Sequence, residues 1–323
     1  MLAFRASICA AFTVIGLSLS FVGPSFAMED TETAFSLTMQ MKEFYRSGKY
    51  LEALPLAQKA LSLREADPNS NESDTAMALN DLGTIHYQLG QYAVAEPFYK
   101  RSLALREKTL GPDHAEIAMV LNNLGDLYRA EQRYAEATIF LKRSILITEK
   151  SRGPDDPSIV LALSNLGAVA SMQGNYAQSA PMFKRGLAIL EKAKGPDDPE
   201  ATVLMNNLAD AYFHQRRYAD AERLLKRSIV VNAKAFGSSH PDIAQAQNTM
   251  AVLYWRQGRK ADAESLFKKS IATLESSLGP SHPDIAGILM NLAGLYKEQG
   301  RFEDARICLK RVVAVRDKTG SNI

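Results

Sequence analysis

The residues best suited to chemistry in this sequence are histidines that stand beside a proline and an aspartate. The stretch GSSHPDIA covers 237–244 and returns as GPSHPDIA at 279–286, with looser copies at 111–118, 153–160 and 195–202. A histidine and an aspartate this close can ligate a metal ion or form an acid/base pair. The alternative is that these stretches only connect secondary-structure elements, and the organisation of the whole chain decides between the two.

From about Asp30 onward, the chain consists of one segment repeated every 42 residues. Leu79–Gly111 aligns with Leu121–Gly153, and seven copies fit without insertion or deletion. Self-similarity at this period indicates that each copy is one supersecondary unit. The predicted repeats are 30–72, 73–114, 115–156, 157–198, 199–240, 241–282 and 283–319.

Each copy carries two amphipathic helical patterns separated by a short polar break. In the second copy, the i, i+3, i+4, i+7 spacing of one helical face is followed by Leu79, Leu82, Gly83 and His86. Small residues recur where the two helices must approach closely, namely at Gly83, Gly125, Gly167, Ala209, Ala251 and Ala293. A single pair cannot bury its apolar faces alone, so we predict an all-α solenoid of seven stacked helix pairs without β-structure.

The repeated pattern LxxLG…Y…GxY…A…F/Y/L…S/A resembles the tetratricopeptide repeat (TPR). The LNNLG, KRSL and EK elements and the GPDHP-type loop are similar to the kinesin-light-chain subgroup, and the resemblance covers about Asp30–Lys318. It implies a right-handed superhelix whose first helices line a concave groove for a peptide or protein ligand. Two copies depart from the pattern, because Met41 replaces a glycine and Lys260 replaces the tyrosine.

Helix pairs give the SHPDIA stretches a structural interpretation. Pro241 and Pro283 suit the first turn of a helix, and Asp242 and Asp284 place a negative charge there. The preceding glycine suits the end of the previous helix. The copies also lie one helix pair apart, so their histidines and aspartates would form a row and not a cluster. We therefore predict no metal site and no cofactor.

Other catalytic patterns are missing from the sequence. It contains no HExxH, no Cys–X–X–Cys, no Walker-type glycine loop and no nucleophile elbow. We predict that the protein is not an enzyme, and an unrecognised active site is the least supported alternative.

The first residues differ from the rest of the chain. Arg5 precedes an almost wholly apolar stretch, 6–22, and Ser25 and Ala27 are small residues at the positions that signal peptidase reads. We predict a signal peptide at 1–27 and a mature chain at 28–323, exported to the periplasm in a bacterium and secreted otherwise. An uncleaved anchor is the alternative. After cleavage Cys308 is the only cysteine left, and we expect it to be buried.

The charge of the chain gives no reason to expect nucleic acid as a partner. The formal net charge is +2 over 323 residues. Basic pairs recur on the second helices, and they are Lys100-Arg101, Lys142-Arg143, Lys184-Arg185, Lys226-Arg227, Lys268-Lys269 and Lys310-Arg311. We interpret them as a solvated face balanced by acids such as Glu107, so we predict no nucleic-acid binding, and no integral membrane segment after signal cleavage.

A second stripe runs along the first helices, one residue away from the packing stripe. By resemblance it faces the groove, and it supplies most of the predicted ligand-binding residues. The full prediction is Asn80, Tyr87, Asn122, Asp126, Arg129, Ser164, Asn206, Asp210, Phe213, Asn248, Trp255, Arg256 and Lys297. The recurrent asparagines can hold a peptide backbone without reading its sequence, or they can bond only to neighbouring helices. The adjacent series, Asn123, Asn165, Asn207 and Asn291, is assigned to packing.

Specificity would come from the stripe members that vary between copies. Trp255 is the only tryptophan, and the core positions of its helix are already taken by Met250, Ala251 and Tyr254. We therefore interpret Trp255, with Arg256, as a binding anchor.

These features predict an exported scaffold or adaptor that binds extended peptide segments or partner proteins in the concave groove. The alternative is a structural module of the cell envelope that forms a homo-oligomer through its C-terminal edge. That edge carries Val313 and Val315, and no polar capping helix follows them.

Overall fold

The computed structural model describes residues 33–319, so the predicted signal peptide lies outside the described residues. The described chain forms fourteen helices and no strand. They are α1 (Ala34–Arg46), α2 (Tyr50–Ala66), α3 (Glu72–Gln88), α4 (Tyr92–Leu110), α5 (Ala115–Ala130), α6 (Tyr134–Arg152), α7 (Ile159–Met172), α8 (Tyr176–Lys194), α9 (Ala201–His214), α10 (Tyr218–Phe236), α11 (Pro241–Arg256), α12 (Lys260–Leu278), α13 (Asp284–Glu298) and α14 (Phe302–Thr319). The prediction of an all-α solenoid of seven helix pairs is confirmed.

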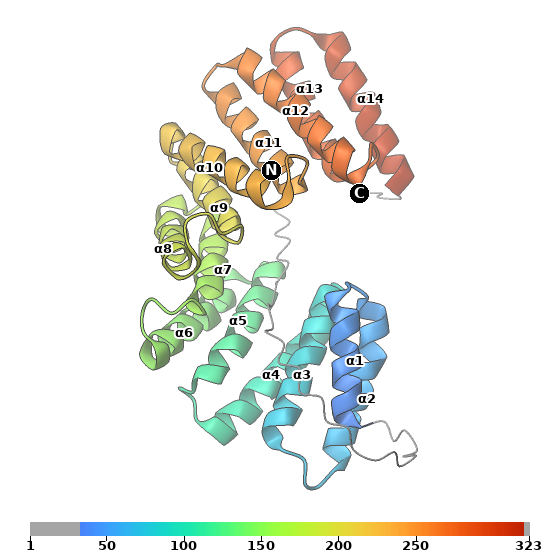
Figure 1. Cartoon of the computed structure of the whole chain (residues 1–323), viewed down its shortest axis with the longest axis vertical. Coiled ribbons are helices and arrows are strands. Elements are labelled where there is room, and N and C mark those ends of the chain that lie inside the picture. The colour runs from blue at the N-terminus through green and yellow to red at the C-terminus, as the bar shows by residue number, and fades with distance from the viewer. Residues whose placement is uncertain (1–32, 320–323) are drawn as a thin grey trace.

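The helix pairs stack into an open arc (Figure 1). Each helix packs on the next one along the chain, and from α3 to α13 each odd-numbered helix also touches the next odd-numbered helix. In the middle of the arc, α5, α7 and α9 lie on the inner side and α6, α8 and α10 on the outer side (Figure 1). We call the surface formed by the odd-numbered helices the inner face.

Close packing within a pair explains the small residues of the repeat. A Cβ atom added to Gly83 would lie 2.7 Å from the ring of Tyr99, and one added to Gly125 would lie 2.5 Å from Leu141. Tyr99 and Leu141 are themselves buried. The two helices of these pairs therefore approach so closely that only glycine fits without a shift.

The His–Pro–Asp stretches form the joints between helix pairs. His114 and His240 are the N-cap residues of α5 and α11, and the Nδ1 of each accepts the backbone N–H two residues later at 3.3 Å. Pro241 is the first residue of α11, as predicted, whereas Pro283 immediately precedes α13 and serves as its N-cap. The helix-stop glycines have positive φ, for example 86° at Gly237. The histidine nitrogen is thus used in capping the helix.

Basic side chains of the second helices hold these joints. Arg143 donates to the Pro112 carbonyl at 2.9 Å, and Lys150 pairs with Asp113 at 2.6 Å. The same two contacts recur in the next repeat through Arg185 and Lys192. Within the described residues there is no group of three or more histidines, cysteines, aspartates and glutamates that could hold a metal ion.

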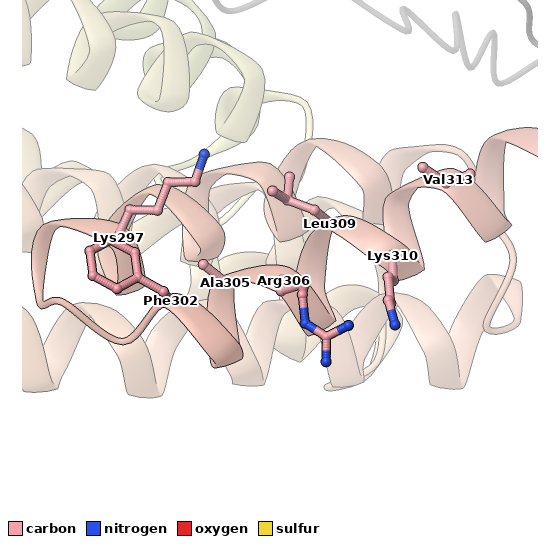
Figure 2. A pocket seen from close by; sticks show the side chains of 7 residues that line it. All are labelled: Lys297, Phe302, Ala305, Arg306, Leu309, Lys310 and Val313. Atoms are coloured by element: carbon pink, nitrogen blue, oxygen red, sulfur yellow. The ribbon is translucent and has the colours of Figure 1, made fainter.

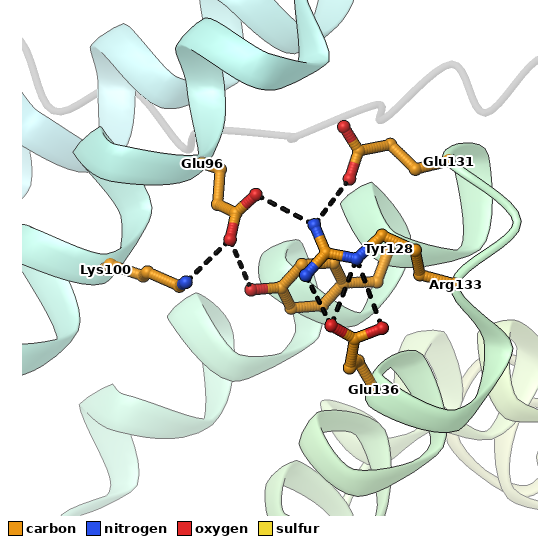
Figure 3. A network of polar contacts seen from close by, with 6 residues as sticks. All are labelled: Glu96, Lys100, Tyr128, Glu131, Arg133 and Glu136. Carbon is orange, nitrogen blue, oxygen red and sulfur yellow. Dashed lines mark hydrogen bonds and ion pairs between the residues drawn. The ribbon is translucent and has the colours of Figure 1, made fainter.

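A polar network joins successive repeats at the turn between paired helices (Figure 3). Glu96 accepts the Tyr128 hydroxyl at 2.9 Å and the Arg133 guanidinium at 2.9 Å, and it pairs with Lys100 at 2.6 Å. Burial alone would raise the pKa of Glu96, but these three donors lower it to about 2. Equivalent tyrosine–glutamate bonds recur at Tyr254–Glu222 and Tyr296–Glu264. The recurrent charges therefore stabilise the stacking of repeats.

Candidate binding surface on the inner face

All thirteen predicted ligand-binding residues lie on the odd-numbered helices between α3 and α13, but their accessibility differs. The exposed members are Arg256 and Lys297. The buried members are Asn80, Asn122, Asp210 and Asn248. The half-buried members are Tyr87, Asp126, Arg129, Ser164, Asn206, Phe213 and Trp255. All thirteen therefore belong to the helices of the inner face, but eleven of them are buried or half-buried.

Asparagine side chains on adjacent repeats are hydrogen-bonded to one another, and we call this series the asparagine ladder. In each step, the Nδ2 of an asparagine donates to the Oδ1 of an asparagine 43 residues earlier. Three such bonds run from Asn123 to Asn80 at 2.9 Å, from Asn165 to Asn122 at 3.1 Å and from Asn291 to Asn248 at 3.1 Å. Asn123, Asn165 and Asn291, which the sequence assigns to packing, therefore bond to the preceding repeat. Their acceptors are the Oδ1 atoms of the asparagines predicted to bind the ligand.

The ladder is interrupted on both sides of α9. Before α9, Asn207 faces Ser164, which has no carboxamide oxygen, and the described structure has no bond between them. After α9, the position facing Asn206 is Thr249, whose hydroxyl donates to the Gln245 carbonyl instead. The Oδ1 of Asn206 is buried and has no hydrogen-bond partner within the described structure.

Tyr87, Asp126 and Arg129 form a compact cluster between α3 and α5. Arg129 donates two hydrogen bonds to Asp126 Oδ1, at 2.9 and 2.6 Å. Burial raises the pKa of the Tyr87 hydroxyl, and the adjacent Asp126 carboxylate raises it further. This cluster is internally satisfied, so its charges offset one another.

Trp255 contributes to the contact between the last two repeats. Its ring lies against Gly294, where an added Cβ would come within 2.9 Å, and meets Phe267 edge-on at 6.5 Å between centroids. Its indole N–H donates to Glu298 at 2.5 Å. Filled core positions in α11 therefore do not leave Trp255 without packing, because Gly294 and Glu298 of the next repeat contact it.

Sequence reasoning missed two residues near α9, Ser171 on α7 and Tyr176 at the start of α8. Ser171 on α7 has a buried hydroxyl oxygen without a partner within the described structure. Tyr176 stacks on His214, with 4.1 Å between ring centroids. Ser171 occupies the repeat position of Tyr87 and Trp255, so a comparison of copies at that position could have found it.

The tetratricopeptide repeat family matches the chain at residues 34–108, 74–145, 116–192, 200–276 and 263–318, so the chain belongs to this family. No curated protein matches it significantly. No helix within residues 33–319 is long and apolar enough to cross a membrane.

Solved structures with the same fold include BtubC (BKLC) from P. vanneervenii, with 19% identity, a TM-score of 0.59, and 72% of this chain and 92% of that chain covered. The apo form of RapI has 14% identity and a TM-score of 0.69, with 90% and 99% covered. The Rap conjugation gene regulator of plasmid pLS20, solved with the Phr* peptide, has 16% identity and a TM-score of 0.61, with 91% and 80% covered.

Proposed function

We propose that this protein is an exported, non-catalytic scaffold that holds an extended segment of a partner protein along its inner face. The observation that carries the proposal is the state of the asparagine ladder. Asn80, Asn122 and Asn248 use Oδ1 on a neighbouring repeat, whereas their Nδ2 groups have no acceptor within the described structure. The unused carboxamide N–H groups in these three repeats can donate to carbonyl groups of an extended peptide. The Rap regulator of pLS20, solved with a peptide, supports a peptide ligand for this fold.

The experiment selects ligands from a library of random linear peptides and compares the wild type with an Asn122→Asp/Asn248→Asp variant. Aspartate keeps the oxygen that accepts from the next repeat but removes the donor. Two lost hydrogen bonds cost about 1–3 kcal/mol in total, so selected peptides should bind about 5- to 160-fold more weakly.

The matched control is Lys142→Glu, an exposed change on the outer helix α6, which should leave peptide affinity unchanged. Melting temperatures of all variants are measured first. Equal affinity of the wild type and the double variant would refute the role of the donors. A library that yields no ligand would refute the proposed function itself.

The export part of the proposal rests on the first 27 residues. Cell fractionation followed by N-terminal sequencing should find a mature protein that begins at Met28. A cytoplasmic protein that retains Met1 would contradict export, and an exported one that retains Met1 would support the anchor.

A second candidate function, self-association, is favoured by the outer surface of α14. Phe302 and Val313 are 71% and 57% exposed, and they line a pocket with Leu309 (Figure 2). Val315, in contrast, is buried. We infer that a second copy of the chain covers these exposed apolar side chains. Light scattering of the mature protein should then show a mass that rises with concentration, whereas a constant monomer mass argues against this candidate.

A further inference from the structure

The inner face contains a buried aspartate on α9 that lacks the partner its counterpart has. Asp210 and Asp126 occupy the same repeat position. Asp126 accepts two hydrogen bonds from Arg129, three residues later, but the residue three after Asp210 is Phe213. Asp210 is only 9% exposed and accepts no hydrogen bond within the described structure. The same carboxylate is therefore neutralised in α5 and left without a guanidinium in α9.

The titratable groups beside Asp210 do not replace that guanidinium. His214 lies one turn further along α9, with its Nε2 3.7 Å from Asp210 Oδ1, beyond hydrogen-bond distance. The Tyr176 ring covers the other face of His214. Burial raises the pKa of the Asp210 carboxyl, which His214 partly opposes. The Asp210 side chain keeps 12% exposure and its carboxylate accepts no hydrogen bond from the described protein, so a ligand that reaches it can supply the missing donors.

Two more polar atoms near Asp210 lack partners. Asn206 lies one helical turn before Asp210, and its Oδ1 is unsatisfied because the ladder stops at Thr249. Ser171 has the same repeat position as Trp255, and Asp210 has the same repeat position as Gly294. In the later pair, Trp255 reaches across to contact Gly294. Ser171 and Asp210 therefore occupy corresponding positions on two helices that are in contact, α7 and α9, and the Ser171 hydroxyl has no partner within the described structure.

We infer that the inner face between α7 and α9 binds the guanidinium group of an arginine side chain carried by the partner peptide. The inference rests on the proposed peptide-binding function and specifies the chemistry of the peptide at one position. At Asp210 the ligand takes the place that Arg129 takes at Asp126. The planar N–H donors of a guanidinium match the Asp210 carboxylate, and Asn206 Oδ1 and Ser171 Oγ are unpaired acceptors on the same two helices.

The test uses the same random peptide library on the wild type, Asp210→Asn and Asp262→Asn. Asp262 is an exposed, arginine-paired aspartate on α12, so it is the matched control. Wild type and control should enrich arginine at one peptide position, and Asp210→Asn should lose that enrichment. Loss of a charged hydrogen bond, about 1.5–3 kcal/mol, predicts about 10- to 150-fold weaker binding of the best arginine peptide.

A second variant and a second peptide keep the inference testable if Asp210→Asn does not fold. Phe213→Arg rebuilds the Asp126–Arg129 arrangement inside the protein and should also abolish arginine enrichment. On the wild type, replacing the selected arginine by citrulline should weaken binding strongly, and lysine should bind with intermediate affinity. Peptides selected without arginine enrichment would overturn this inference and leave the proposed function standing, whereas an empty selection would overturn the proposed function.

Discussion

Two glycine-to-alanine changes separate the effect of close packing from the effect of helix propensity. Gly125 on α5 faces Leu141, and an added Cβ would lie 2.5 Å from Leu141 Cγ and 2.7 Å from Cδ2. Gly287 on α13 is exposed, and an added Cβ would meet no atom within 4 Å. Both glycines lie inside helices. The propensity gain of alanine is therefore common to both, and only Gly125→Ala adds a clash.

The expected magnitudes follow from these distances. Alanine is favoured over glycine inside a helix by about 1 kcal/mol, so Gly287→Ala should raise the free energy of unfolding by up to that amount. At Gly125, Leu141 or the α5 backbone must move by about 1 Å, and overpacking of this kind costs about 1–3 kcal/mol. The net change for Gly125→Ala is thus a loss of up to about 2 kcal/mol.

Urea denaturation followed by far-ultraviolet circular dichroism measures both changes. The two variants should differ by about 1–3 kcal/mol, with the midpoint shifted in opposite directions and the slope m unchanged. Equal stabilisation by both substitutions would refute the reasoning, because the close approach of α5 to α6 would then not constrain position 125.

Two further changes test the turns and the buried charges. Gln132 has φ 61° at a position where every other repeat except the fifth, which has Arg216, carries glycine. Gln132→Gly should therefore raise the melting temperature, reflecting about 0.5–1 kcal/mol, while Gly90→Ala at the same repeat position should lower it, and a fall for Gln132→Gly would contradict this. Burial raises the pKa of Asp81 to about 6, against the opposing influence of Lys42 and Arg64. The folded pKa therefore exceeds the unfolded value of 3.8, and stability is lost as the pH rises from about 4 to 6. Asp81→Asn should then stabilise the protein by up to about 3 kcal/mol at pH 7 and have little effect at pH 3, and urea midpoints that differ equally at both pH values would contradict this.

The recurrent features of this fold, namely the helix pairs, their stacking and the joints between them, could be predicted from the sequence by comparing its repeats. The 42-residue offset, the apolar spacing around Leu79 and Leu82, and the glycine before each joint predicted the helix pairs and their stacking. The apolar spacing and the joint glycines are local features that depend on residues within one or two turns of helix, and the 42-residue offset shows only that they recur. The sequence also predicted that the stretches between helix pairs end one helix and start the next. The structure adds that the N-cap residue of α5 and of α11 is the histidine.

The partners of the inner-face residues could not be predicted in the same way. A ladder bond joins residues 43 positions apart, and Trp255 reaches Gly294 and Glu298 in the next repeat. Such contacts depend on the rotation between stacked pairs, which no single helical pattern encodes. Asp126 and Asp210 differ in another way, because only Asp126 has an arginine three residues later in its own helix, and the sequence already shows that difference.

The sequence by itself determined the class of architecture and the face on which the variable residues lie, because periodicity of 3.6 and 42 residues is a one-dimensional property of the chain. Only the tertiary structure decided which polar groups on that face are already paired and which are not. Hydrogen bonding between repeats is short-ranged and directional, so it depends on how the helix pairs stack. That stacking pairs Asn123 with Asn80 and Asn165 with Asn122, and it leaves the Oδ1 of Asn206 without a partner within the described structure.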